Sequence, residues 1–165
     1  MEKGRRLVDL YRFPGFRPRA SVRGVFGDPK ARVVRLERRG KKTLCGVCGQ
    51  RSRRIYDRKR RRVRDLSCGD ARIYREVEIR RVRCGDCGTV KQETLPWLAD
   101  NPFYTNRFAF FVVRRCRTAT IRDVAREVHL DWKTVKDLEK EGQAAGVSFR
   151  STPTARHTPH HRREL

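Results

Sequence analysis

The sequence predicts an α+β fold in which a small β module is followed by a three-helix bundle and then by a disordered tail. Two cysteine pairs, Cys45 with Cys48 and Cys84 with Cys87, enclose 35 residues of basic, strand-like sequence. From Thr105 onward the apolar residues recur every three to four positions instead of every two. The change of period marks the passage from the β module to the helices.

Both cysteine pairs have the same local pattern, which reads Cys45-Gly-Val-Cys48-Gly and Cys84-Gly-Asp-Cys87-Gly. This spacing forms a tight turn whose two thiolates bind one cation, so four sulfurs can complete a tetrahedral zinc site. A redox Cys-x-x-Cys would need the motif at the start of a helix in a βαβ unit, and the sequence offers none. We therefore predict a zinc ribbon with one structural zinc ion, bound by Cys45, Cys48, Cys84 and Cys87.

Two further cysteines, Cys68 and Cys116, lack a partner at ligand spacing. Cys68 lies in a turn signal, Cys68-Gly69-Asp70, from which it could approach the metal, but we expect it to be a bystander. Cys116 follows two valines and is expected to be a small core residue.

The charge balance points to a polyanionic partner, with 42 Lys and Arg against 19 Asp and Glu and a net charge of +23. The charge is +10 over residues 1–44 and +8 over 45–87 but zero over 117–141. Such a balance is atypical of a soluble enzyme and favours nucleic acid. No apolar run approaches the roughly 20 residues of a membrane-spanning helix, and no signal-peptide core follows Met1. We expect a cytoplasmic, nucleoid-associated protein that uses no membrane.

Residues 1–44 are expected to be a basic leader with short strands. Short apolar patches are separated by proline and glycine, which argues against long helices. One strand is expected around Val33 to Glu37, packed on the zinc module.

The segment from Arg51 to Arg64 carries nine basic residues and one acid, Asp57. A charge run of this kind is usually a solvated face. Here Ile55, Tyr56 and Val63 interrupt it at spacings that can bury one side, so we expect a strand with its basic groups held on a surface. The candidate DNA contacts in this segment are Arg58, Lys59, Arg60, Arg61 and Arg62.

A second strand is expected from Ile73 to Arg83, after the Cys68 turn, which makes a β-hairpin between the two cysteine pairs. Its alternation slips before Val82 and predicts a bulge or twist there. Trp97, in the connector that follows, is expected to seal the zinc module, with stacking on a base as the less favoured reading.

Three helices are expected after the connector. The first is capped by Thr105 and buries Phe108, Phe111 and Val112. The second is capped by Thr120, with Asp123 in a capping-box position, and buries residues around Val124 and Val128. The third runs from Trp132 to Glu141, with Asp131 as its N-cap and with Val135 and Leu138 buried.

Two short helices joined by the turn His129-Leu130-Asp131, with the small Ala125 at their crossing, indicate a helix-turn-helix. The third helix would then lie in the major groove. Its candidate contacts are Trp132, Lys133, Thr134, Lys136 and Lys140. Two observations keep an ordinary three-helix bundle open as an alternative: His129 stands where glycine is usual, and residues 117–141 carry no net charge.

The order of these motifs resembles the amino-terminal half of insertion-sequence transposases of the ISL-three type. The resemblance covers about residues 20–143 and includes Tyr56-Asp57-Arg58 and Arg62-Val63-Arg64-Asp65-Leu66 between the cysteine pairs. It implies zinc ligation by the four cysteines and binding to the terminal inverted repeats of a mobile element. In that family a catalytic domain of the DDE kind follows.

The sequence departs from the family after the helices, because Glu164 is the one carboxylate beyond Glu141. DDE chemistry needs three carboxylates to hold two metal ions, so we expect no catalytic residue and no small-molecule substrate. The chain is thus interpreted as the DNA-binding portion of a truncated transposase. Expected partners are double-stranded DNA and either a second copy or an intact transposase. The alternatives are a stand-alone zinc-ribbon regulator and a basic RNA- or ribosome-associated protein.

These predictions divide the chain into four parts. They are the basic leader (1–44), the zinc ribbon (45–99), the helix-turn-helix (103–141) and the disordered tail (142–165).

Overall fold

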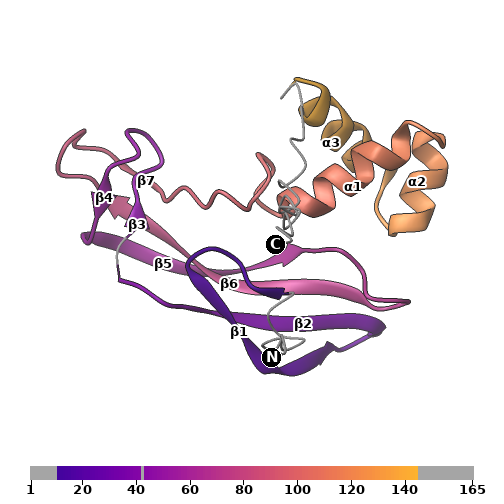
Figure 1. Ribbon diagram of the computed structural model, residues 1–165, viewed down its shortest axis with the longest axis horizontal. Helices are drawn as coiled ribbons and strands as arrows, with labels where there is room; N and C mark the ends of the chain where they lie inside the picture. The colour runs from indigo at the N-terminus through magenta and orange to yellow at the C-terminus, as the bar shows by residue number, and fades with distance from the viewer. Residues whose placement is uncertain (1–10, 42, 145–165) are drawn as a thin grey trace, which may run out of the picture.

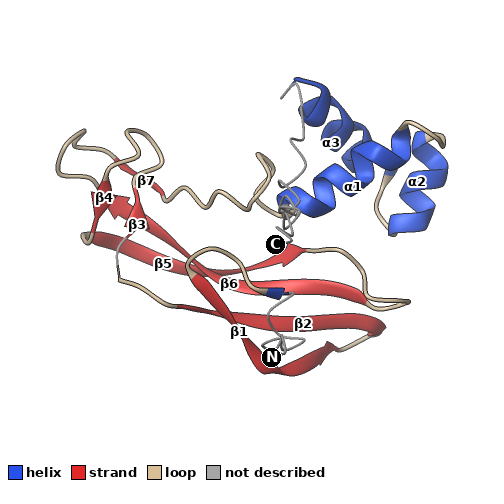
Figure 2. Ribbon diagram, in the orientation of Figure 1, coloured by secondary structure: helices blue, strands red, loops and turns tan. Residues whose placement is uncertain are grey.

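The computed structural model describes residues 11–41 and 43–144, which form strands first and helices afterwards, as predicted (Figures 1 and 2). The strands are β1 (Phe16–Val25), β2 (Asp28–Arg38), β3 (Thr43–Leu44), β4 (Arg51–Ser52), β5 (Ile55–Arg64), β6 (Arg72–Arg83) and β7 (Val90–Gln92). The helices are α1 (Asn106–Cys116), α2 (Ile121–Val128) and α3 (Trp132–Ala144). Among these described residues no helix is long and apolar enough to cross a membrane. The strands followed by helices confirm the predicted α+β class.

The main sheet has the strand order β1-β2-β6-β5, and β7 pairs with one end of β6. The predicted hairpin is present as β5 and β6, which pair antiparallel and are joined through a turn closed by Cys68 and Ala71. A separate pair, β3 with β4, carries the first cysteine pair between its two strands. The sheet thus places the two cysteine pairs at the same end.

The amino-terminal segment differs from the expected leader with one strand near Val33. It forms a long hairpin, β1 with β2, which turns at Gly27 with a φ of 75°. The hairpin joins the sheet by parallel pairing of β2 with β6, beginning at Ala31 and Arg72. Pro18 is tolerated because β1 is an edge strand, where a missing N–H can face away from the ladder. Local sequence patterns do not reveal pairing between segments about forty residues apart.

The phase slip near Val82 is present, but the extra residue lies on the neighbouring strand. Along β6 the buried positions alternate as far as Ile79 and then shift to Arg80 and Val82. Ile55 pairs with Val82 while Asp57 pairs with Arg81, so Tyr56 of β5 has no partner across the ladder. The bulge therefore belongs to β5 and not to β6, where the sequence analysis placed it.

One face of the sheet carries a hydrophobic core to which Trp97 contributes. Its ring centroid lies 4.5 Å from that of Phe13 and 5.5 Å from that of Phe16. The other buried members are Leu36, Val63, Val77 and Ile79. Trp97 belongs to the connector between β7 and α1, which runs from the cysteine end of the sheet to the helices (Figure 1). Trp97 thus packs in the core of the sheet, on Phe13 and Phe16 of the amino-terminal segment, and does not join the hydrophobic cluster around the cysteines. Its burial rules out the base-stacking reading.

The three helices begin at the predicted caps. The side chains of Thr105, Thr120 and Asp131 accept backbone N–H groups at 3.3, 3.2 and 2.8 Å, respectively. The helices bury Phe108, Val112, Val124, Ala125, Val128, Val135 and Leu138 in one shared core. His129 adopts the left-handed conformation, with a φ of 54°, and so takes the place of the usual glycine.

The carboxy-terminal end differs from expectation at one point. Helix α3 continues to Ala144, three residues into the segment from 142 that the sequence analysis assigned to the tail. Gly142 has a packing reason to be there, because a Cβ at this position would lie 2.5 Å from Cγ2 of Val113 on α1. The rest of the expected tail, 145–165, lies outside the described residues.

Candidate zinc centre and DNA-binding surface

The fold brings the four predicted zinc ligands together. Their sulfur atoms all lie within 4.8 Å of one another. Cys45 Sγ is 3.7 Å from Cys87 Sγ, and Cys48 Sγ is 3.5 Å from Cys84 Sγ. Tetrahedral zinc with Zn–S bonds of about 2.3 Å requires sulfur separations of roughly 3.8 Å. The four cysteines therefore fit one closed, structural zinc site.

Both cysteine pairs are held by the same backbone turn. The N–H of Cys45 donates to the carbonyl of Gln50 at 2.8 Å, and the N–H of Cys84 donates to that of Thr89 at 3.0 Å. Gly49 and Gly88, which follow the second cysteine of each pair, have φ values of 70° and 67°. Glycine adopts this left-handed conformation without steric cost, so the turn can direct both sulfurs inward.

Gly46 is required for a different reason. A Cβ at this position would lie 2.1 Å from the backbone oxygen of Gln92, beside β7. The first cysteine turn thus packs directly on the backbone that follows the second. Glycine at the Cys-Gly-x-Cys position allows the two halves of the zinc site to approach closely.

The electrostatics of the cluster lower the pKa of Cys45 and Cys87 and raise that of Cys48. Hydrogen bonds from the side chain and backbone of Thr89 lower the pKa of Cys87 to about 6. The backbone N–H of Gln50 would lower the pKa of Cys48, but the neighbouring Cys84, burial and the other two thiols raise it to about 12. A divalent cation among the sulfurs favours the thiolate of each, which couples metal binding to proton release.

The remaining two cysteines lie away from this cluster. Cys68 is exposed at the turn between β5 and β6, and Cys116 packs on the helical core. Burial raises the pKa of Cys116, which makes it an unreactive thiol. The structure thus places both as the sequence analysis expected.

Helix α3 presents most of its candidate DNA contacts to solvent. Trp132, Lys133, Lys136 and Lys140 are exposed, and Lys136 Nζ lies 5.8 Å from the ring centroid of Trp132. Thr134 differs, because it is half-buried and both its N–H and its hydroxyl donate to the carboxylate of Asp131. The hydroxyl of Thr134 is already used to bond the N-cap residue Asp131. Only its methyl group is then left to contact DNA.

The basic residues of β5 do not form one surface. Side chains alternate along a strand, so Arg58, Arg60 and Arg62 share one face while Lys59 and Arg61 belong to the other. On the first face, Arg60 pairs across the ladder with Glu78, and Arg62 with Glu76. On the second, the guanidinium of Arg61 lies 4.9 Å from the ring centroid of Phe103 in the connector. Arg58, Lys59, Arg60 and Arg62 are exposed, whereas Arg61 is half-buried.

Sequence analysis assigned no structural role to Asp65, which joins the sheet to the helices. Its fully buried carboxylate accepts hydrogen bonds from Arg75 Nε at 2.7 Å, Arg107 Nε at 2.6 Å and Thr105 Oγ1 at 3.0 Å. Burial alone would raise the pKa of Asp65, but the bond from Arg107 and the charges of Arg75 and Arg107 lower it. One sequence signal could have pointed to it, namely an acid directly after the basic run of β5.

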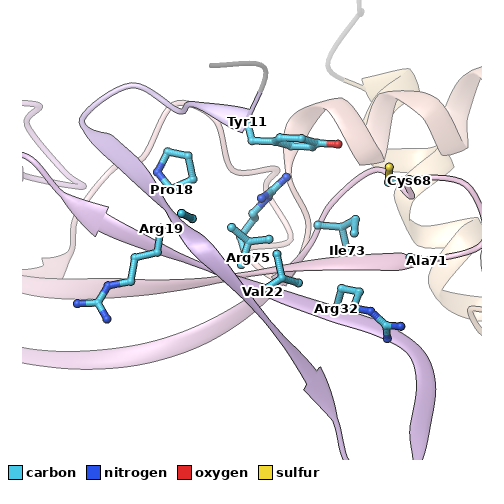
Figure 3. A pocket seen from close by; sticks show the side chains of 11 residues that line it. Tyr11, Pro18, Arg19, Val22, Arg32, Cys68, Ala71, Ile73 and Arg75 are labelled. Atoms are coloured by element: carbon cyan, nitrogen blue, oxygen red, sulfur yellow. The ribbon is translucent and has the colours of Figure 1, made fainter. Parts of the chain in front are cut away.

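Arg75 also borders a cavity of about 500 Å³ with mostly apolar walls, formed between β1, β2 and β6. Figure 3 shows its guanidinium directed toward the ring of Tyr11, and the two are 4.7 Å apart. Other walls come from Pro18, Val22, Cys68 and Ile73. The two terminal nitrogens of Arg75 have no hydrogen-bond partner in the described part of the chain. None of the sequence-predicted site residues lines this cavity.

Comparison with known proteins gives two matches to family models. The zinc-finger model of the IS204/IS1001/IS1096/IS1165 transposases matches residues 41–87, and the helix-turn-helix domain of transposase family ISL3 matches residues 93–141. The first segment contains the cysteine cluster, and the second contains α1, α2 and all of α3 except its last three residues.

One similar curated protein is the transposase for insertion sequence element IS1001 from Bordetella parapertussis. The two are 35% identical over 114 residues, which are 69% of this chain and 28% of the relative. The chain thus spans little more than a quarter of that relative. No solved structure matches the chain.

Proposed function

Because the chain carries the zinc-ribbon and helix-turn-helix domains of ISL3 transposases, we propose that it recognises the terminal inverted repeats of a mobile element as duplex DNA. Both matched segments are DNA- or zinc-binding modules, and no catalytic domain is matched within the chain. The function proposed for these residues is therefore recognition without strand cleavage or transfer.

The exposed side of α3 is the observation that carries this proposal. Val135 and Leu138 hold the opposite side of α3 in the core, and Ala125 on α2 is small enough for the two helices to cross closely. Lys133 and Lys136 are then free to reach the O6 and N7 atoms of guanine, the commonest direct readout by basic side chains. Trp132 and Lys140 flank them and contact the sugar-phosphate backbone.

The other contacts and partners that we propose follow from the basic residues of β5 and from the similarity to ISL3 transposases. Arg58, Arg60 and Arg62 contribute phosphate contacts, which position the protein without reading sequence. A second copy of the chain or a longer transposase of the same element is the proposed protein partner. The proposed location is the cytoplasm, at the nucleoid.

The test selects duplexes from a random library with the whole chain and then compares affinity for a selected and a scrambled duplex. Lys133→Ala with Lys136→Ala should reduce the ratio of the two affinities by tenfold or more, because each lost base contact costs about 1–3 kcal/mol. The matched control, Arg19→Ala with Arg23→Ala, removes the same charge from β1 and should leave the ratio unchanged.

Salt dependence provides a second readout of the same complexes. Wild-type affinity should fall steeply as salt rises, since phosphate contacts release counterions. An equal loss on both duplexes for the Lys133 and Lys136 variant would refute the role of α3. Equal or better binding to RNA hairpins would favour the ribosome-associated alternative instead.

A further inference from the structure

Ion pairs neutralise several arginines of the sheet, including Arg81 near the zinc end. Arg19, Arg23, Arg38, Arg72 and Arg81 pair with Glu37, Glu76, Glu93, Asp28 and Asp57, respectively. Beside the cysteine turns, five exposed basic residues form no ion pair within residues 11–41 and 43–144. They are Arg51, Arg53, Arg54, Arg83 and Lys91. Together with Tyr56 we call them the zinc-end surface.

Tyr56 gives this surface an aromatic face. It is the extra residue of the β5 bulge, and 53% of it is exposed. The guanidinium carbons of Arg81 and Arg83 lie 5.1 and 5.5 Å from its ring centroid. A bulge redirects a side chain out of the regular ladder, here toward two arginines. Cation–π contact with the ring restrains the two guanidinium groups, and a restrained, exposed Arg83 suits contact with phosphate.

The zinc-end surface lies at a defined separation from the helices. Tyr56 and Asp65 are nine residues apart along β5 and its end, which corresponds to roughly 30 Å of extended strand. Figure 1 shows the cysteine turns and the helices rising from the same side of the sheet at its opposite ends, with the connector between them. One turn of B-form DNA is about 34 Å long, so a single duplex can span both ends.

We propose that the zinc-end surface is a second duplex-binding site that contacts phosphates about one helical turn from the bases read by α3. This inference rests on the proposed function, because α3 sets the register of the DNA. The zinc ion contributes indirectly, since it holds the turns that carry Arg51, Arg53 and Arg54 in place. The second contact adds affinity and sets the length of the site, but it reads no sequence.

Hydroxyl-radical footprinting on the selected duplex tests the proposal. The whole chain should protect two segments on one face of the DNA, separated by about one turn. Arg53→Ala with Arg54→Ala should weaken protection of the second segment only and reduce the salt slope by about 2. The charge-matched control, Arg19→Ala with Arg23→Ala, should retain both segments, because these arginines are already ion-paired on β1.

A shortened duplex completes the test. DNA cut back to the segment read by α3 should lose at least as much wild-type affinity as the Arg53 and Arg54 variant loses on long DNA, because the variant keeps Arg51, Arg83 and Lys91. The variant should discriminate less between long and short DNA than the wild type does. A single protected segment, or an equal effect of the variant on both lengths, would overturn the inference and leave the α3 proposal intact. Undiminished sequence preference in the Lys133 and Lys136 variant would instead refute the proposed function.

Discussion

The hydroxyl of Thr105 donates to the carboxylate of Asp65, with 3.0 Å between the oxygens, while the same hydroxyl accepts the N–H of Phe108 at 3.3 Å. The side chain that begins α1 is thus fastened to the residue that follows β5. Asp65 also binds Arg75 of β6 and Arg107 of α1. One buried carboxylate therefore orients the three helices on the sheet, and the proposed two-point binding to a duplex would depend on that orientation.

Replacement of Asp65 by Asn should cost about 3–5 kcal/mol of unfolding free energy, because it leaves buried guanidinium charge without its carboxylate. The loss is measured by urea denaturation followed by circular dichroism. Asp57→Asn is the matched control, because Asp57 pairs with the exposed Arg81 and surface ion pairs stabilise little. Similar small losses for both variants would contradict the role assigned to Asp65.

Acid should weaken the protein partly through Asp65. The pKa of Asp65 is lowered in the folded chain, so its contribution is fully present above the unfolded value of about 4 and is lost as pH falls through the folded value. We expect the stability difference between wild type and Asp65→Asn to be constant near neutral pH and to shrink below about pH 4. A difference that stayed constant to pH 2 would argue against a lowered pKa. Other carboxylates are the same in both proteins, so the difference isolates this one.

Replacement of Cys84 by Ser should abolish binding of zinc and unfold the cysteine turns while the helices remain formed. Cys84 is buried in the cluster, and a structural zinc site requires all four ligands. Elemental analysis of the purified variant and its helical circular dichroism signal provide the measurements. Cys68→Ser should retain one zinc ion per chain, because Cys68 lies outside the cluster. Full zinc content in the Cys84 variant would exclude the proposed ligand set.

Replacement of Gly142 by Ala should destabilise the helical bundle, although alanine is the better helix former. The new Cβ would lie 2.5 Å from Cγ2 of Val113, which is part of a branched side chain with little freedom to move. Overpacking of this kind costs about 1–3 kcal/mol. The double variant Gly142→Ala with Val113→Ala should be less unstable than the sum of the two single variants. Additive losses in thermal or urea denaturation would show that the two sites do not touch.

Local signals in the sequence predicted the parts of this protein whose geometry is set by nearby residues. The Cys-x-x-Cys-Gly turns could be predicted because two thiolates and a left-handed glycine are specified within five residues. The caps Thr105, Thr120 and Asp131 were likewise predictable, since each bonds an N–H three residues further along. The face of α3 that stays exposed followed from its helical period, although Thr134 proved to be committed to its own cap.

Contacts between distant residues could not be predicted in this way. The β1–β2 hairpin looked like a leader because its strands are stabilised by parallel pairing of β2 with β6, about forty residues away. Alternation along β5 and the contact of Arg61 with Phe103 then decided which face each basic side chain occupies, and a run of charges alone does not reveal that. Local sequence patterns were enough to place the two modules, the four cysteines of the zinc site and the exposed side of α3. Tertiary structure decided how the modules are joined, through the burial of Asp65 between Arg75, Thr105 and Arg107. A buried charge requires partners wherever the fold brings them together, and these came from β6 and from the start of α1.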